Sequence, residues 1–203
     1  MYAASARALA SKLLRWGVIA EAELDEKIYG LKNGIALIIC SFTILVIGFL
    51  MGMPLEGAVF LAMFATLRSY TGGFHCGGDL SCYLSSCATT VLFLAACRYM
   101  LGTAEAYPAF AAGGAGVLLI VSLAPVEAPK KPIDDLERYV FRGRALRRMS
   151  AQLLAAILLH IFGLRSLSVV LLMTLALVGV TVLLGAAANN HAACRKPPYV
   201  ATP

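Results

Sequence analysis

Residues 33–55 read NGIALIICSFTILVIGFLMGMPL and carry no charged side chain. A helix of these 23 residues is long enough to cross a hydrocarbon core about 30 Å thick. The rest of the chain has the same character, because 60% of its 203 residues are hydrophobic and only 14% are charged. A soluble domain of this size carries charge on about a quarter of its residues. We therefore expect an all-α, polytopic integral membrane protein.

Further uncharged stretches follow the first one. They are residues 57–67, 80–97, 106–126, 149–164 and 166–194. The stretch 57–67 is short for a full crossing and predicts a tilted, partial or re-entrant helix. The last stretch begins as a helix, and we expect it to leave the membrane near Gly185, where the sequence turns polar. The chain thus predicts about six hydrophobic helical segments in one membrane domain, residues 1–203.

The basic residues predict the orientation of these segments. With a cytoplasmic N-terminus and six crossings, 15 of the 17 Lys and Arg residues fall on the cytoplasmic side, which leaves Arg98 and Arg165 outside. Both termini are then cytoplasmic, although a re-entrant second segment breaks the alternation unless a neighbour also fails to cross. We interpret the net charge of +6 as a sign of topology rather than of nucleic-acid binding.

The transmembrane or re-entrant helices are expected within residues 34–185. The regions before and after them are expected at the cytoplasmic face. Residues 1–33 contain Leu9, Leu13, Trp16 and Ile19 at helical spacing, which predicts an amphipathic helix on the inner leaflet. A poorly ordered tail is the alternative. The acidic residues of this region argue against a signal peptide, and residues 186–203 are expected to form a cytoplasmic tail.

A polar, glycine-rich stretch lies between two apolar ones. Residues 68–82 read RSYTGGFHCGGDLSC. The glycine pairs break a helix and let a ligand approach the backbone closely. Such a segment is costly at membrane depth unless it packs in protein or lines a cavity. This segment, at the predicted cytoplasmic face, is therefore the candidate functional site.

His75 and Cys82 are the candidate reactive pair. On one continuous helix they would lie roughly 10 Å apart along the axis, out of contact. If the glycines bend the chain and a helix begins with Asp79 as its cap, Cys82 takes the third helical position and the two side chains can converge. The helix dipole and a nearby imidazole both favour the thiolate. A nucleophile beside a base is typical of covalent acyl transfer, although a His and a Cys seven residues apart also occur by chance.

A soft-metal site is a second interpretation of the same stretch. His75, Cys76, Cys82 and Cys87 are all ligand types for such a metal, but the tighter CxxC-type pairs of most metal sites are missing. The six cysteines as a group are expected to be thiols rather than a disulfide framework, because several lie inside apolar runs.

The string R-x-Y-x-G-G-x-H-x6-C, from Arg68 to Cys82, resembles the signature of the accessory gene regulator protein B (AgrB) family. Members of this family are bacterial membrane cysteine endopeptidases that mature quorum-sensing propeptides. A second match, Ala124-Pro125 followed by the run from Lys130 to Ile133, resembles the family's A-P and K-K-P-I segment. The resemblance covers residues 30 to 185.

The resemblance implies a role for each matched residue. Cys82 would attack a peptide bond near the C-terminal end of a short propeptide and form a thioester, with His75 as base and then acid. A cysteine or serine of the propeptide would then close a thiolactone or lactone ring. No cofactor is implied.

Other positions carry weaker expectations. Asp79 either orients His75 or caps the helix, and the cap is favoured. Arg68, Gly72, Gly73, Lys130 and Lys131 are candidate substrate-binding residues, since the family's propeptides are amphipathic with an acidic C-terminal region. For the two lysines, a simple place at the membrane interface is an equal alternative.

The expected partners are the propeptide and the lipid bilayer of the bacterial cell membrane, with a homodimer left open and no nucleic acid. The alternative function is a small membrane transporter or soft-metal-binding protein that uses His75, Cys76 and Cys82. A transporter would bury polar groups at matched depths in several spans, whereas here they cluster in one segment.

Overall fold

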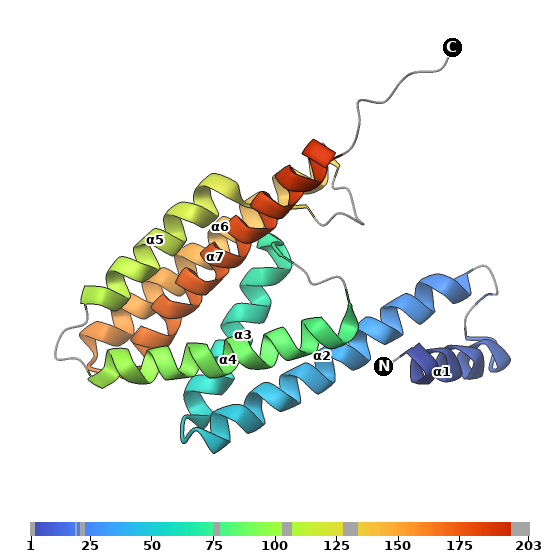
Figure 1. Cartoon of the computed structure of the whole chain (residues 1–203), viewed down its shortest axis with the longest axis horizontal. Helices are drawn as coiled ribbons and strands as arrows, with labels where there is room; N and C mark the ends of the chain where they lie inside the picture. Colours follow the sequence, from blue (N-terminus) through green and yellow to red (C-terminus); the bar gives the residue numbers. More distant parts are fainter. Residues whose placement is uncertain are drawn as a thin grey trace, which may run out of the picture.

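The computed structural model describes residues 3–18, 20, 23–74, 78–102, 107–127 and 134–195, with side chains up to residue 189. Within these ranges the chain forms seven helices and no strand. They are α1 (Ala3–Arg15), α2 (Leu24–Leu50), α3 (Pro54–Thr71), α4 (Asp79–Gly102), α5 (Tyr107–Leu123), α6 (Asp135–Ile161) and α7 (Arg165–Arg195). Figure 1 shows α5, α6 and α7 as one bundle, α2 and α4 as a pair, and α3 between them.

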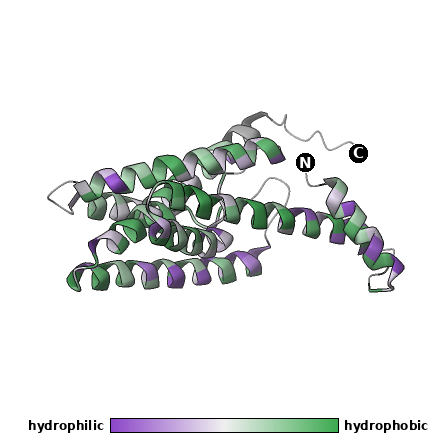
Figure 2. Cartoon of the chain, turned by 90° about the horizontal axis from the view of Figure 1, so that it is seen from below, coloured by the Kyte–Doolittle hydropathy of each residue, from purple (hydrophilic) through white to green (hydrophobic). Residues whose placement is uncertain are grey.

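The all-α membrane fold predicted from the sequence is confirmed. Three helices are long and apolar enough to cross a membrane, namely α2, α4 and the part of α7 from Arg165 to Asn189, and α5 is a shorter apolar helix. Figure 2 shows mostly hydrophobic residues along the helices other than α1 and the beginning of α6. Their outward apolar side chains, such as Ile38 and Phe42 on α2, are more than 60% exposed, as expected of side chains that lipid covers.

Several helices extend beyond the apolar stretches that predict them. α3 has 18 residues, or about 27 Å, because Pro54 fits the first turn and the helix continues past the apolar stretch to Thr71. α6 starts at Asp135, well before its apolar part, and α7 continues past Gly185 to Arg195. The number of full crossings and the exit near Gly185 stay predictions.

α1 packs on α2 through small residues. Ala6 and Ala10 are fully buried, and α1 is in contact with α2. The helix ends at Arg15, so Trp16 follows it; the indole is 65% exposed and lies 4.9 Å from the Lys12 ammonium. The predicted amphipathic helix is thus present up to Arg15, whereas Ile19 lies outside the described residues.

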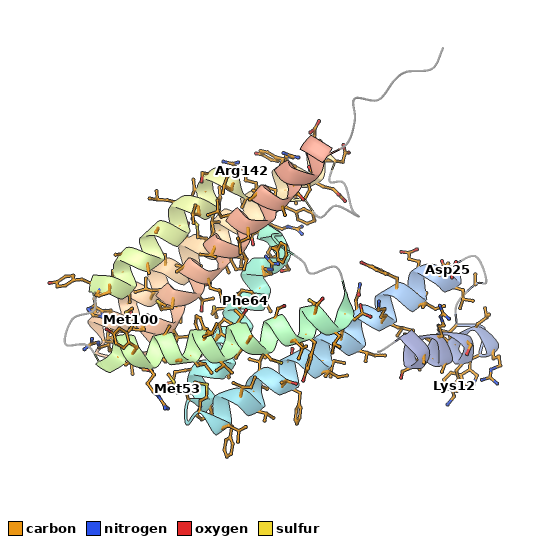
Figure 3. The ribbon with its side chains drawn as sticks, in the orientation of Figure 1. Lys12, Asp25, Met53, Phe64, Met100 and Arg142 are labelled. Atoms are coloured by element: carbon orange, nitrogen blue, oxygen red, sulfur yellow. The ribbon has the colours of Figure 1, made fainter. Side chains whose placement is uncertain are left out.

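The bundle is built on close backbone contact between α5 and α7. Gly116 on α5 lies against Leu175 and Ala176, and a Cβ on Gly179 of α7 would lie only 2.7 Å from the Gly116 Cα. Small residues at such a crossing bring apolar helices close enough for dense packing in lipid. Phe64 of α3 packs against the apolar clusters on both sides of it and joins the bundle to α2 and α4 (Figure 3).

Candidate active site

Arg68, in the last turn of α3, caps the C-terminal end of that helix. The chain turns after Thr71 through Gly72 and Gly73, whose φ angles of 66° and 125° favour glycine. Arg68 folds back and donates one hydrogen bond to the Gly72 carbonyl oxygen, at 2.7 Å, and another to the Phe74 carbonyl oxygen. Its charge also lies where the helix dipole is negative. Arg68 therefore fixes the path of the segment that leads to His75.

Two other parts of the chain hold this segment in place. The Val126 N–H donates to the Thr71 carbonyl oxygen at 2.9 Å, and Val126 pairs with Gly72 in a short parallel bridge. On the other side, the Phe74 N–H donates to the Thr181 carbonyl oxygen of α7 at 3.0 Å. The Gly72–Phe74 segment is thus tied to the bundle.

The glycines are required by close backbone packing. A Cβ on Gly72 would overlap the Val126 carbonyl oxygen, and one on Gly73 would lie 2.8 Å from the Thr181 carbonyl oxygen. Gly185 of α7 completes the contact, because its Cβ would lie 2.7 Å from the Gly73 carbonyl carbon. The backbone that approaches these glycines is therefore the protein's own. Substrate binding by Gly72 and Gly73 stays a prediction.

The Gly185→Ala variant tests this contact. The added methyl meets backbone rather than a flexible side chain, so we expect it to separate the Gly73–Phe74 segment from α7 and to destabilise the protein by about 1–3 kcal/mol. Gly143→Ala in α6 is the matched control, since nothing lies within 4 Å of its Cβ and alanine favours a helix. Heating the detergent-solubilised variants and measuring the folded fraction by size exclusion compares the two. Equal stability of both variants would contradict the proposed contact.

Cys82 lies at the beginning of α4. The helix begins at Asp79, and the Cys82 N–H donates to the Gly78 carbonyl oxygen at 3.0 Å. Gly78 thus precedes the first turn and Cys82 is the fourth helical residue, one later than expected. Its own N–H is therefore engaged within the helix.

Arg68 and Cys82 lie within electrostatic range of each other. The Cys82 side chain is half-buried and its sulfur is a thiol. A negative charge on Cys82 would interact favourably with the Arg68 guanidinium, although the two residues belong to different helices. A guanidinium near the sulfur favours the thiolate, which is the nucleophilic form.

Asp79 forms an ion pair that sequence reasoning missed. The Lys32 ammonium of α2 lies 2.9 Å from Asp79 Oδ1, with side chains 31% and 36% exposed. A partly exposed pair of this kind contributes at most about 1 kcal/mol to stability, so its main effect is on geometry. The position of Lys32, the last charge before the long apolar stretch, was the only signal for it. The capping and His75-orienting roles of Asp79 stay predictions.

Some of the predicted site residues lie outside the described residues. They are His75, Cys76, Lys130 and Lys131. Among the residues that the structure does describe, no group of three or more His, Cys, Asp or Glu side chains could hold a metal ion. The alternative metal site depends on His75 and Cys76 and is therefore a matter for experiment.

Tyr70 links the motif to the basic part of α6. Its ring lies 6.0 Å from the Arg144 guanidinium carbon and 5.7 Å from that of Arg148. Arg142, on the same helix, donates to the Val121 carbonyl oxygen of α5 (Figure 3). No role was predicted for Tyr70 from the sequence, and its place in the motif was the only indication of one.

The comparisons with known proteins agree with the motif. The profile of the family described as accessory gene regulator B matches residues 6–184. Searches of curated proteins and of solved structures find no match. The profile match supports a part in processing the propeptide of accessory gene regulator quorum sensing. Because it covers most of the chain, this membrane protein belongs to the accessory gene regulator protein B (AgrB) family.

Proposed function

We propose that the chain is a cysteine endopeptidase that cleaves a short autoinducer propeptide near its C-terminal end and promotes its cyclisation. One observation carries the proposal: Cys82 lies in the first turn of α4, within electrostatic range of Arg68, which itself holds the segment leading to His75. A thiol beside a fixed cation, with a histidine seven residues earlier, has the groups that acyl transfer needs.

The chemistry has two steps. The Cys82 thiolate attacks the carbonyl carbon of the scissile peptide bond, and His75 protonates the amine as the carbon–nitrogen bond breaks, which leaves a peptidyl thioester. A thiol or hydroxyl of the propeptide then attacks the thioester carbon, gives its proton to His75 and displaces the Cys82 thiolate. The product is a thiolactone or lactone, and the activated acyl group passes from sulfur to the ring without ATP.

The same proposal includes the surroundings of the site. The protein spans the bacterial cell membrane several times with both termini in the cytoplasm, and the site opens at the cytoplasmic face. The substrate is an amphipathic propeptide whose acidic C-terminal region is held by Arg68, Lys130 and Lys131. The six apolar segments and the distribution of basic residues support this orientation.

The proposal is tested by trapping the thioester. The native protein is co-expressed with the small cysteine-containing peptide encoded beside its gene, and digests are analysed by mass spectrometry for a peptide adduct on Cys82 that hydroxylamine removes. His75→Ala is expected to abolish the adduct. An adduct on another residue would contradict the assignment. Protection of Cys82 from alkylation by zinc or copper, together with absence of processing, would favour metal binding instead.

A further inference from the structure

The two halves of α4 have different neighbours. Its buried residues, Thr90, Phe93, Leu94 and Cys97, all lie from the middle of the helix onward, and Phe93, Leu94 and Cys97 belong to the apolar cluster shared with α3 and α7. Residues 79–89, which carry Cys82 and are referred to here as the first half of α4, contain no buried residue. Figure 1 shows this half beside α2 and away from α5, α6 and α7. Packing against the bundle therefore does not fix the position of Cys82.

Polar contacts with α2 hold this half of the helix instead. Lys32 pairs with Asp79 at the first residue of α4, and the Thr43 hydroxyl lies 3.0 Å from the Tyr83 hydroxyl. Thr43 gives its one hydroxyl proton to the Ile39 carbonyl oxygen at 2.9 Å, so Tyr83 is the donor in the contact between helices. We refer to the Lys32–Asp79 and Thr43–Tyr83 contacts as the polar seam.

The polar seam lies on either side of Cys82 along the chain. Asp79 is three residues before it and Tyr83 is directly after it. By contrast, the segment that leads to His75 is tied to α7 through Phe74 and Thr181. The parts of the chain that carry the two reactive groups thus have separate supports, and residues 75–78 join them.

From this division we propose that the polar seam positions Cys82 against the segment that carries His75, with Lys32 and Tyr83 as positioning residues for acyl transfer. The inference rests on the proposed function. Both contacts are small in energy, but a displacement of about 1 Å between reacting groups can lower a rate by about 100-fold. Loss of the seam is therefore expected to act on the rate of acylation, whereas substrate binding and folding depend on other contacts.

The variants Lys32→Met and Tyr83→Phe test the seam, since each removes one contact and keeps the size of the side chain. We expect each to lower kcat for propeptide cleavage by about 10-fold, with KM and the temperature of unfolding unchanged. Lys32→Arg should restore the rate, because it keeps the charge opposite Asp79. Lys27→Met, at an exposed lysine of α2, and Tyr107→Phe, at the exposed start of α5, are the controls and should behave as native.

The outcomes separate this inference from the proposed function. If the native protein forms no adduct on Cys82 with any propeptide, the proposed function fails and the seam proposal fails with it. If the native protein is active and both variants cleave at the native rate, the seam proposal alone is wrong. The seam proposal is also wrong if the variants that lose rate also unfold at a lower temperature than the native protein, or if KM changes instead of kcat.

Discussion

The Cys82→Ala variant is expected to lose propeptide cleavage by at least about 1,000-fold, because loss of a covalent nucleophile removes the acylation step altogether. The fold should survive, since the Cys82 side chain is only half-buried and lies in the half of α4 that does not enter the apolar cluster. The measurement is the initial rate of peptide cleavage in membranes, normalised to the amount of protein.

Cys87→Ala is the matched control for this loss. Cys87 lies on the same helix, is also a half-buried thiol and is five residues further along the chain. The Cys87→Ala variant should cleave the propeptide within about twofold of the native rate, as is usual for a substitution outside the reacting groups. Cleavage that survives in Cys82→Ala, or that is lost equally in Cys87→Ala, would move the search to another nucleophile.

The second large effect is on stability, at the crossing of α5 and α7. Gly116→Ala places a methyl carbon 2.5 Å from the Leu175 carbonyl carbon and 2.6 Å from the Ala176 Cα, where only backbone is available to move. We expect the helices to separate and the protein to lose about 3 kcal/mol or more, since overpacking against backbone is at the upper end of such costs.

Gly114→Ala, two residues earlier on α5, is the control for the Gly116 variant. Nothing lies within 4 Å of its Cβ, so alanine should leave the free energy of unfolding equal or raise it by up to about 1 kcal/mol. Denaturation in mixed micelles, followed by the circular dichroism of the helices, compares the two. A Gly116→Ala protein as stable as Gly114→Ala would show that the crossing is looser than described.

The sequence predicted the helices well, because a long apolar stretch between charges in an α-helical membrane protein satisfies its backbone hydrogen bonds in lipid by forming a helix. Residues 80–97 lie within α4, whereas the first stretch, 33–55, is divided: residues 33–50 lie within α2, the chain turns at Gly52, and Pro54 and Leu55 begin α3. The helix ends were harder to predict: α6 begins with a charged, exposed turn from Asp135 to Arg138, and nothing in hydropathy marks such a polar turn as helical.

The site was predictable as a set of residue types rather than as an arrangement. The motif marked Arg68 and Cys82, and the structure places them within electrostatic range of each other. The use of Gly72 and Gly73 in packing depends on Val126 and Thr181, which lie far away in the sequence and carry no distinguishing feature. The role of Lys32 was missed because its partner, Asp79, also lies far away in the sequence, at the start of α4.

Trp16 gives the protein a local optical reporter. It is the only tryptophan in the chain, it follows α1 directly, and Lys12 lies over its ring. Its emission therefore reports the environment of α1, and a shift to shorter wavelength on adding vesicles would signal that this helix has entered the lipid headgroup region. A denaturation curve recorded by tryptophan emission would follow the release of α1 from α2. Unfolding of the bundle that holds the site would have to be followed by the circular dichroism of its helices.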